Sequence, residues 1–242
     1  SEVIFFGTKP RLHSTDLPTS VTIAGNVIPV SSTVKILGVK LDNTLSFSDH
    51  VNDVVRGCNY HLRALRHIRR YMSQDVAKSV AFSIVGSRLD YCNCLLYDMG
   101  IGLTTKLQRV ENNLTRIVCD EQFRNRRGQR PSQELLRELH WLPVAGRINF
   151  KVALLCYKAY RLREPAYLQT LIQPYVPARC LRSSADCDQL TVRKRNLKTA
   201  ARRFSVAAPI VWNSLSQTTR AAETVDAFKT ALKTELMSAR TV

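Results

Sequence analysis

The stretch VKILGVKLDNTLSFSDHV, residues 34–51, contains the change of pattern that decides the fold. Its first part, Val34–Leu41, is an apolar run typical of a buried strand, although Gly38 interrupts it. The dipeptide Asp42–Asn43 is typical of a turn, and the polar residues from Ser48 onward indicate the start of a helix. The chain therefore changes from strand to helix here, and the glycine indicates either a bulge or a close approach by another backbone.

The other strand signals also lie within residues 1–47. Glu2–Phe6 is one candidate strand. Val21–Ala24 and Val27–Val30 are two more, and they flank Gly25–Asn26, a dipeptide suited to the positive φ angles of a two-residue turn. The segment has four Lys and Arg against three acidic residues. We therefore expect a small antiparallel β region here, and the positive charge of the chain lies elsewhere.

From Ser48 onward the apolar residues follow a helical period. They recur at spacings of three and four as far as Met72, which predicts one buried face of a helix about six turns long. A second stripe on the same helix, well round from the first, consists of arginines. These are Arg56, Arg63, Arg66 and Arg70. One face is expected to pack and the other to present guanidinium groups.

Two further helices are expected before residue 120. One starts at Ser73, whose hydroxyl can cap it, and the other runs from Thr104 to Cys119. Short connections predict that the helices form an antiparallel bundle over 48–119. The expected inward residues are Val76, Val80, Ile84, Cys92, Leu95 and Leu96 on the first of these helices, and Leu107, Val110, Leu114 and Ile117 on the second.

Residues 120–131 have no apolar period and carry four arginines, so they are interpreted as a basic linker or exposed loop. Residues 132–242 are expected to form a second, mainly helical region. In it, Ser132 caps a short helix, Ile148–Leu162 is central to a second core, and Thr224–Ser238 is an amphipathic helix. The predicted fold class is therefore α+β, mostly α.

The charge balance indicates a polyanionic partner. The 242 residues include 36 Lys and Arg against 19 Asp and Glu, a formal net charge of +17. Nucleic acid is the commonest partner of such a field, although ribosomal, membrane-surface and merely soluble proteins share it. No apolar run approaches the roughly 18 residues of a membrane helix, and the first residues lack the order of a signal peptide. We expect an intracellular chain, in the nucleus or cytoplasm, without a membrane partner.

The sequence contains no self-contained catalytic or metal site. It has no Asp-Asp pair, Walker loop, dinucleotide glycine pattern or His-Glu-x-x-His motif. The seven cysteines lack zinc-site spacing and are interpreted as reduced and mostly buried. Asp90, His50 and His140 are interpreted as structural, with His140 buried beside Trp141, and Trp141 and Trp212 are interpreted as core residues. No catalytic residue, metal ligand or cofactor is predicted in this chain.

Eight short segments occur in one order along nearly the whole chain. They are KILGV with LD and LSF (35–47), LRALR (62–66), SRLDYCN (87–93), LQRVEN (107–112), LHWLPV (139–144), RINFK (147–151), LRSS (181–184), and FSVAAP with WNSL (204–215). Their order resembles the carboxy-terminal part of the reverse transcriptase of non-LTR (LINE-type) retrotransposons, in the jockey-like branch. Ser216 is a departure, because the family usually has proline after the WNSL segment.

The resemblance implies that 1–47 is the end of a polymerase palm, that 48–119 is the thumb, and that 132–242 is the region that follows it. It implies that the partner is an RNA or RNA–DNA template–primer. The Asp-Asp motif, the two Mg²⁺ ions that it holds and the fingers would lie upstream of this chain, which would then bind nucleic acid without catalysing polymerisation. The alternative is a host-adopted or relic helical scaffold that binds proteins and whose basic face is merely solvated. The sequence leaves the oligomeric state open.

The candidate nucleic-acid contacts come from three parts of the chain. The resemblance places the primer-grip strand at Leu37, Gly38 and Val39, with Lys40 beside it. The helical stripe contributes arginines among Tyr60, His61, Arg69 and Tyr71, a mixture suited to phosphates and base stacking. Residues 193–203 contribute six basic residues and no acid. Besides the four residues at the strand, the candidates are Arg56, Arg63, Arg66, Arg70, Arg193, Lys194, Arg195, Arg202 and Arg203.

Overall fold

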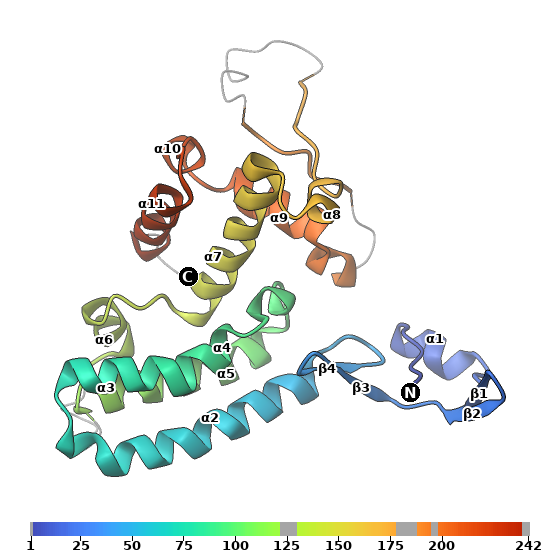
Figure 1. Cartoon of the computed structure of the whole chain (residues 1–242), viewed down its shortest axis with the longest axis horizontal. Helices are drawn as coiled ribbons and strands as arrows, with labels where there is room; N and C mark the ends of the chain where they lie inside the picture. Colours follow the sequence, from blue (N-terminus) through green and yellow to red (C-terminus); the bar gives the residue numbers. More distant parts are fainter. Residues whose placement is uncertain (1, 122–129, 178–187, 195–197, 239–242) are drawn as a thin grey trace.

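The computed structural model describes residues 2–121, 130–177, 188–194 and 198–238. Within these ranges the protein is mostly helical, with two separate two-stranded antiparallel sheets near the N-terminus, so the predicted fold class is confirmed. Figure 1 shows a thin arm that carries the strands, a lower group of helices (α2 to α6) and an upper group (α7 to α11). Most of the predicted basic linker and the candidate contact Arg195 lie outside the described residues.

The arm begins with the short helix α1, Lys9–Ser14, and continues as a hairpin of β1, Ser20–Ile23, and β2, Asn26–Pro29. The two turn residues are Ala24 and Gly25, with φ angles of 47° and 80°. The predicted turn at Gly25–Asn26 was therefore wrong by one residue, because Asn26 pairs with Ile23. The expected strand Glu2–Phe6 is also wrong, since only Val3 makes an isolated bridge, to Val30.

The apolar run Val34–Leu41 is a hairpin rather than the single strand predicted for it. Its strands are β3, Thr33–Ile36, and β4, Val39–Asp42. Leu37 and Gly38 form the two-residue turn, with φ angles of 47° and 83°. Two successive left-handed residues define the type I′ turn that matches the twist of antiparallel strands. The glycine therefore turns the chain back on itself.

The loop after β4 leads into the longest helix, α2, Ser48–Ile68. The Asp42 carboxylate fixes this loop, because it accepts the backbone N–H groups of Ser46 (2.9 Å) and Phe47 (2.7 Å) and the hydroxyl of Thr44 (2.6 Å). Partial burial acts to raise the pKa of Asp42, but these hydrogen bonds lower it overall. The predicted six-turn helix is confirmed, and the 3₁₀ turn η1, Arg69–Tyr71, ends it.

The chain then returns along α2 as a nearly continuous helical rod. The rod consists of α3, Gln74–Ala81, the π turn η2, Phe82–Gly86, and α4, Ser87–Asp90. Ser73 caps α3 as predicted, since its Oγ accepts the N–H of Val76. The predicted buried face is correct only in part: Leu96 is buried and Val80, Ile84 and Cys92 pack against the core, but Val76 is 49% exposed and Leu95 is 42% exposed. The most buried residues of the rod repeat every four positions and are Ala77, Ala81, Val85 and Leu89.

The third helix of the bundle is α5, Ile101–Val118, which follows the 3₁₀ turn η3, Asn93–Leu96. Its four predicted inward residues are all buried. Beyond the linker, α6, Ser132–Glu138, packs on α5. Pro131 occupies the cap position of α6, and Ser132 is its first residue, so the predicted cap was wrong.

The upper group is arranged around α7, Val144–Tyr157, which begins four residues before the predicted Ile148. The π turn η6, Lys158–Leu162, and α8, Ala166–Gln169, follow it. The remaining elements are η8, Lys198–Arg202, α9, Phe204–Asn213, α10, Gln217–Arg220, and α11, Val225–Ser238. The predicted tail helix is confirmed, with Phe228 and Leu232 fully buried.

Two hydrophobic cores meet along α7. Val144 and Ile148 belong to the core of α2, α4 and α5, whereas Val152 and Cys156 belong to the core that contains Trp212. Trp141, at the end of the segment after α6, also joins the first core. The division between the two cores therefore lies within α7, rather than at residue 131, and the two groups of helices share a rigid element.

Candidate nucleic-acid interface

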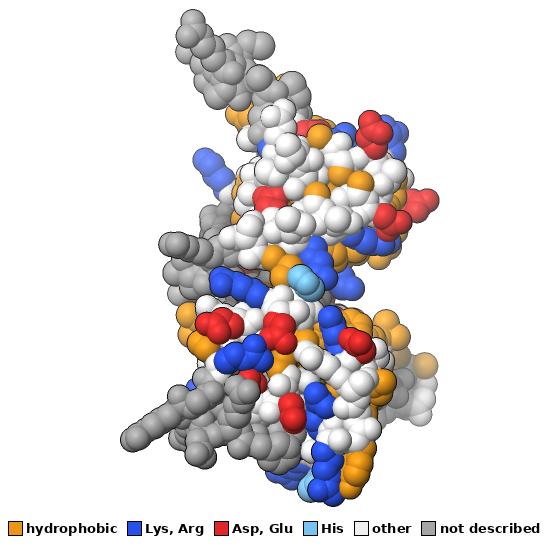
Figure 2. Space-filling model, turned by 90° about the vertical axis from the view of Figure 1, so that its left-hand side faces the viewer, with side chains coloured by type: hydrophobic (Ala, Val, Ile, Leu, Met, Phe, Trp, Pro, Cys, Tyr) orange, Lys and Arg blue, Asp and Glu red, His pale blue; other side chains and the backbone are white. Residues whose placement is uncertain are grey.

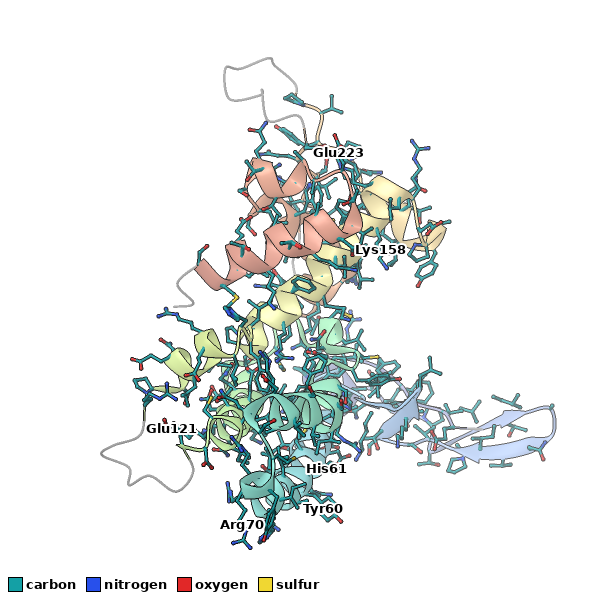
Figure 3. All side chains as sticks on the ribbon, turned by 60° about the vertical axis from the view of Figure 1, so that its left-hand side comes forward. Tyr60, His61, Arg70, Glu121, Lys158 and Glu223 are labelled. Carbon is teal, nitrogen blue, oxygen red and sulfur yellow. The ribbon has the colours of Figure 1, made fainter. Side chains whose placement is uncertain are left out.

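The outer face of α2 is the candidate interface. Arg56, Arg63 and Arg66 on α2 and Arg70 on η1 are exposed, while Val51, Cys58, Leu62 and Leu65 are buried on the opposite side. The predicted two-faced helix is therefore confirmed. Figure 3 shows Tyr60 and Arg70 projecting from the lower end of the molecule, away from the other helices. We call Arg63, Arg66 and Arg70, with Tyr60 and Tyr71, the arginine face.

Acidic residues neutralise only the first turns of α2. Asp53 lies 3.6 Å from Arg56 and 3.8 Å from Lys40, and Asp49 also lies 3.8 Å from Lys40. In the described residues no carboxylate lies within 4.0 Å of Arg63, Arg66 or Arg70 (the ion pairs found involve other residues). The positive charge of α2 is therefore uncompensated over its second half.

Exposed aromatic rings lie among these arginines. Tyr60 is 71% exposed and Tyr71 is 74% exposed. The guanidinium carbon of Arg70 lies 4.7 Å from the centre of the Tyr71 ring, and Tyr60 contacts His61 edge-on at 5.3 Å. Figure 2 shows basic, histidine and hydrophobic side chains together at the lower end of the molecule. Flat exposed rings beside guanidinium groups provide stacking surfaces as well as charge.

Arg69 differs from its neighbours, although the sequence pattern placed it with them. Its side chain is buried, and its guanidinium donates to the carbonyl oxygens of Ile117 (3.1 Å), Val118 (2.9 and 3.1 Å) and Met72 (2.7 Å). Two of these carbonyls belong to the last turn of α5, where no intrahelical donor is available. Arg69 thus caps α5 and joins it to the end of α2. Because its guanidinium is buried, it is not available to contact nucleic acid.

The turn of the β3–β4 hairpin packs against Tyr91, the residue that follows α4. The Tyr91 hydroxyl donates to the carbonyl oxygen of Leu37 at 2.6 Å, and a Cβ on Gly38 would meet the Tyr91 ring at 3.5 Å. Val39 is buried in the first core. The close neighbour that the glycine indicated is therefore a tyrosine of the same chain. Of the three predicted primer-grip residues, Leu37 presents its side chain to solvent, at 85% exposure.

A cavity of about 360 Å³ lies between this turn and α2. His50 borders it and accepts the backbone N–H of Lys40 at 3.4 Å. Burial lowers the pKa of His50 against an opposing effect of Asp53, which favours the neutral imidazole that can accept this bond. The structural role predicted for His50 is thereby confirmed.

The basic residues of 193–203 differ in their exposure and contacts. Arg193, Lys194 and Arg203 are exposed. Arg202, in contrast, donates to the carbonyl oxygen of Leu45 in the loop before α2. It therefore links the segment before α9 to the lower group of helices. This structural role is an alternative to the predicted contact of Arg202 with nucleic acid.

Arg147 on α7 is the centre of a polar cluster that joins the two groups of helices. Its Nε lies 2.7 Å from Glu111 Oε1 and donates to the Leu142 carbonyl oxygen at 3.0 Å, and its Nη1 lies 2.9 Å from Asp90 Oδ2. Gln108 donates to Glu111 at 3.0 Å. The structural role predicted for Asp90 is confirmed. Glu111 and Arg147 lie in the quoted segments LQRVEN and RINFK, but no spacing pattern indicated that they would pair.

Burial is the main influence on Glu111, and it raises the pKa of this fully buried carboxyl to about 7, against the opposing effect of Arg147. His140 was expected to be buried beside Trp141, but it is exposed and has a positive φ of 54°. The chain reverses there between α6 and Trp141, which turns the imidazole outward. The buried roles predicted for Trp141 and Trp212 are confirmed.

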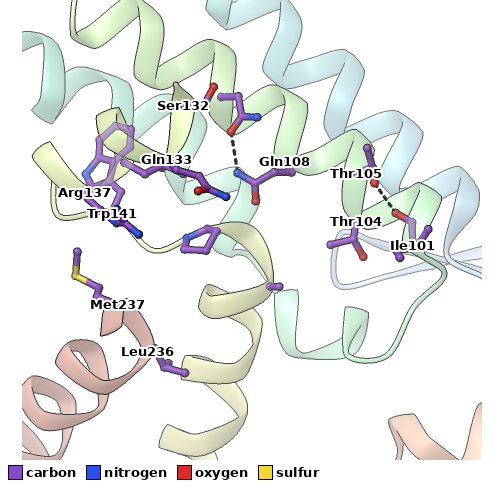
Figure 4. A pocket seen from close by; sticks show the side chains of 14 residues that line it. Ile101, Thr104, Thr105, Gln108, Ser132, Gln133, Arg137, Trp141, Leu236 and Met237 are labelled. Atoms are coloured by element: carbon purple, nitrogen blue, oxygen red, sulfur yellow. Dashed lines mark hydrogen bonds between the residues drawn. The ribbon is translucent and has the colours of Figure 1, made fainter. Parts of the chain in front are cut away.

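A cavity of about 690 Å³ lies between α5, α6, the start of α7 and the end of α11 (Figure 4). Its polar lining is mainly neutral, with Gln108, Asn112 and Gln133 among it, and Gln108 donates to Asn112 at 2.9 Å. Among the described residues of the lining, Arg137 alone is charged. This cavity lacks the concentrated positive charge of the arginine face, so it is a weaker candidate for binding a polyanion.

Within the described part of the chain, no group of three or more His, Cys, Asp or Glu is placed to hold a metal ion. Five cysteines in those ranges are free thiols, and burial raises the pKa of Cys58 to about 11. Cys180 and Cys187 lie outside the described residues. None of the described helices is both long and apolar enough to span a bilayer.

Comparisons of this chain with protein-family models, curated proteins and solved structures gave no match.

Proposed function

We propose that the chain binds nucleic acid through phosphate contacts of the arginine face. The observation that carries the proposal is the uncompensated charge of Arg63, Arg66 and Arg70, which follow one another at spacings of three and four on one side of the helix. These spacings place the three guanidinium groups along about two helical turns. A row of cations of this length suits successive phosphates of one strand better than it suits a single small anion.

The segment order described above supports a more specific form of the proposal. It favours an RNA or RNA–DNA duplex as the ligand, held as a template–primer by a fragment of a non-LTR retrotransposon reverse transcriptase. Phosphate contacts carry no base information, so binding by this face alone is sequence-independent. Tyr60 and Tyr71 add surfaces on which sugars or terminal bases can stack.

The test replaces the three arginines together with glutamine, R63Q/R66Q/R70Q, and measures affinity for an RNA–DNA duplex across a range of salt. Each neutralised phosphate contributes about 0.7 to 0.9 to the log–log slope of affinity against salt. The variant should therefore lose affinity at low salt, and its slope should fall by roughly 2 to 3. All three positions are exposed, so folding should be unaffected.

The matched control is K9Q/R11Q/K158Q, which removes the same charge from exposed positions away from α2. Figure 3 shows Lys158 in the upper part of the molecule and Arg70 at its lower end. The control should keep most of the wild-type salt slope. Equal losses in the two variants would mean that net charge, and not this face, attracts the duplex. A wild-type affinity that does not change with salt would overturn the proposal.

One observation favours a second function, a scaffold that binds another protein. The arm exposes apolar side chains on strands that lack a third partner strand within the described residues, with Val27 at 69% and Ile23 at 51% exposure. Two-stranded hairpins are marginal alone, and an added strand or a covering surface stabilises them. Nuclease-treated pull-downs distinguish this reading: a protein recovered by the wild type but not by I23S/V27S supports the scaffold, and recovery that depends on nucleic acid rejects it.

A further inference from the structure

A second set of basic and aromatic residues lies away from α2, where the lower and upper groups of helices meet. A cavity of about 250 Å³ there is lined by Phe82, Trp141 and Phe150. It adjoins a cavity of about 360 Å³, with which it shares Phe150 and Lys233. We call the two together the junction cleft. Figure 2 shows basic side chains and a histidine at the waist between the two parts of the molecule.

The backbone holds the aromatic walls of the junction cleft in place. A Cβ on Gly86 would lie 2.8 Å from the Phe82 ring, so the glycine makes room for that ring in the π turn. The Arg147 guanidinium carbon lies 5.9 Å from the centres of both the Phe82 and the Trp141 rings. Since Arg147 is fixed by Glu111 and Asp90, these two walls are preorganised.

The charge of the junction cleft is positive. Lys151 and Lys233 line it, and no carboxylate in the described residues lies within 4.0 Å of either ammonium group (the ion pairs found are elsewhere). The acidic lining residue Asp90 is already paired with Arg147 at 2.9 Å. Aromatic walls beside two unpaired ammonium groups match a flat ring that carries an anionic group.

Asn93 provides an independent observation that points to a ligand. Its side chain lines the junction cleft and is 2% exposed. The amide nitrogen donates weakly to Asp90 at 3.4 Å, while Oδ1 has no hydrogen-bond partner in the described part of the chain. A buried acceptor without a partner is costly to folding and is rare in native proteins. A ligand with an N–H donor would satisfy it.

We propose that the junction cleft binds a nucleotide, with the base between the aromatic walls, an N–H group of the base edge on Asn93, and the phosphate near Lys151 and Lys233. The nucleotide has two sources, a free mononucleotide or an unstacked nucleotide of a single strand. The site goes beyond the proposed function, because a duplex held on the arginine face needs no base in a cavity. A single strand that reaches both sites would be held by phosphates at one and by a base at the other.

Tryptophan fluorescence tests the proposal on the full chain. Trp141 lines the junction cleft, and the chain's other tryptophan, Trp212, is fully buried in the second core. An eight-nucleotide adenine strand should quench the emission, and an abasic strand of equal length should bind about 5- to 150-fold more weakly with no quenching. Adenosine monophosphate is titrated in parallel: a midpoint close to that of the strand assigns a mononucleotide site, and a much higher midpoint assigns a strand.

Two variants separate the residues of the junction cleft from general charge. K151Q/K233Q should raise the quenching midpoint for the adenine strand on the order of tenfold, whereas the control K9Q/K158Q should leave it nearly unchanged. Quenching by the abasic strand equal to that by the adenine strand would overturn the proposal, because it would need no base. So would equal midpoints for the two double variants, or no quenching by either adenine ligand.

Asn93→Leu adds a readout that a purely structural residue would not give. The variant removes the unpartnered acceptor, so its melting temperature without ligand should equal or exceed that of the wild type, while the quenching midpoint rises. A lower melting temperature with an unchanged midpoint would assign Asn93 to folding and overturn its role here. R63Q/R66Q/R70Q in the same assay should keep the quenching by adenosine monophosphate, so failure of the arginine face and failure of the junction cleft are distinguishable.

Discussion

Arginine occupies two contrasting environments in this molecule. At the junction, Arg147 is 10% exposed, and Glu111, Asp90 and a backbone carbonyl surround its guanidinium. On the arginine face, Arg63 and Arg66 are exposed, with no acidic partner in the described residues. A buried charge persists only where opposite charges and hydrogen bonds offset its desolvation, whereas an exposed charge needs no partner. Pairing therefore marks the arginines that hold the fold together.

The contrast shows why net charge alone assigns no function. Of the arginines near the end of α2, Arg69 caps α5 while Arg70, its neighbour in sequence, lies over an exposed tyrosine ring. Both add equally to the net charge of +17. Only the unpaired, exposed cations remain available to an external polyanion. The number and position of these cations therefore predict binding better than the net charge of the chain does.

The largest expected effect comes from breaking the junction. At about pH 8, above the Glu111 pKa of about 7, Arg147→Met removes the cation beside this fully buried residue and leaves a carboxylate without its main partner. Breaking one side of a buried ion pair costs about 3 to 5 kcal/mol, so the free energy of unfolding in urea should fall by that amount. Arg63→Met, on the exposed face, should change it by less than about 0.5 kcal/mol. Similar losses in the two variants would remove the distinction between the two environments.

The pH dependence of stability is the next largest effect expected. Burial raises the pKa of Glu111 to about 7, so between about pH 4.5 and 7 the folded protein retains a proton that the unfolded chain releases. This contribution is fully present below the unfolded pKa and is lost as pH rises through 7. The free energy of unfolding should therefore fall across this range, by up to about 3 kcal/mol.

Glu111→Gln isolates that contribution, since the amide keeps the shape of the side chain but does not titrate. Subtracting the variant's unfolding curve from that of the wild type at each pH cancels the other titrating groups. A difference that stays flat from pH 4.5 to 7 would show that Arg147 keeps Glu111 ionised in the folded protein, against the predicted direction.

A smaller loss is expected at the helix cap. Arg69→Met leaves the carbonyl oxygens of Ile117 and Val118 without their side-chain donor in a buried position. Each such group costs about 1 to 3 kcal/mol if water cannot reach it, and we expect a total near 2 to 3 kcal/mol. Arg70→Met, one residue along the chain, should be close to neutral in chemical denaturation. A neutral Arg69→Met would mean that water replaces the guanidinium and that the cap is dispensable.

Periodic patterns in the sequence predicted the long elements well. Most of the apolar stripe of α2 and the four inward residues predicted on α5 are buried, because a long helix repeats its signal over several turns; Ile68, at 48% exposure, is the exception on α2. The face of α3 was identified only in part, since Val80 packs against the core but Val76 is exposed, and the fully buried residues are the small Ala77 and Ala81. Close helix packing favours the small side chains at that interface, and no local pattern encodes this.

The site was predicted only in part. The exposed stripe was found, but pairing across distant elements was not, because Arg69 contacts residues 48 and 49 positions later in the chain. The hairpin at Leu37–Gly38 was missed for a different reason. Apolar residues continue through the turn without a polar break, so the run resembles one strand, and only the positive φ angles reveal the reversal.

That turn gives a prediction of about 1 to 2 kcal/mol. Gly38 has a φ of 83°, a region that costs other residues roughly this much, so Gly38→Ala should lower the free energy of unfolding accordingly. A Cβ there would meet Tyr91 only at ordinary contact distance, so the backbone and not crowding sets the loss. Gly38→Asn, which tolerates left-handed φ, should recover most of it. Duplex affinity lost by both variants with folding intact would instead support a direct contact at Gly38.

The smallest effect tests how firmly this outer turn is held to the body of the protein. Tyr91→Phe deletes the hydroxyl that donates to Leu37 at 2.6 Å while keeping the ring against Gly38. Tyr91 is 52% exposed, so water offsets part of the loss, and we expect about 0.5 to 1 kcal/mol. Because α2 and the junction make no use of this bond, hydrogen exchange should speed up at the β3–β4 amides alone. Faster exchange throughout α2 would show that the turn also stabilises the helix that carries the arginine face.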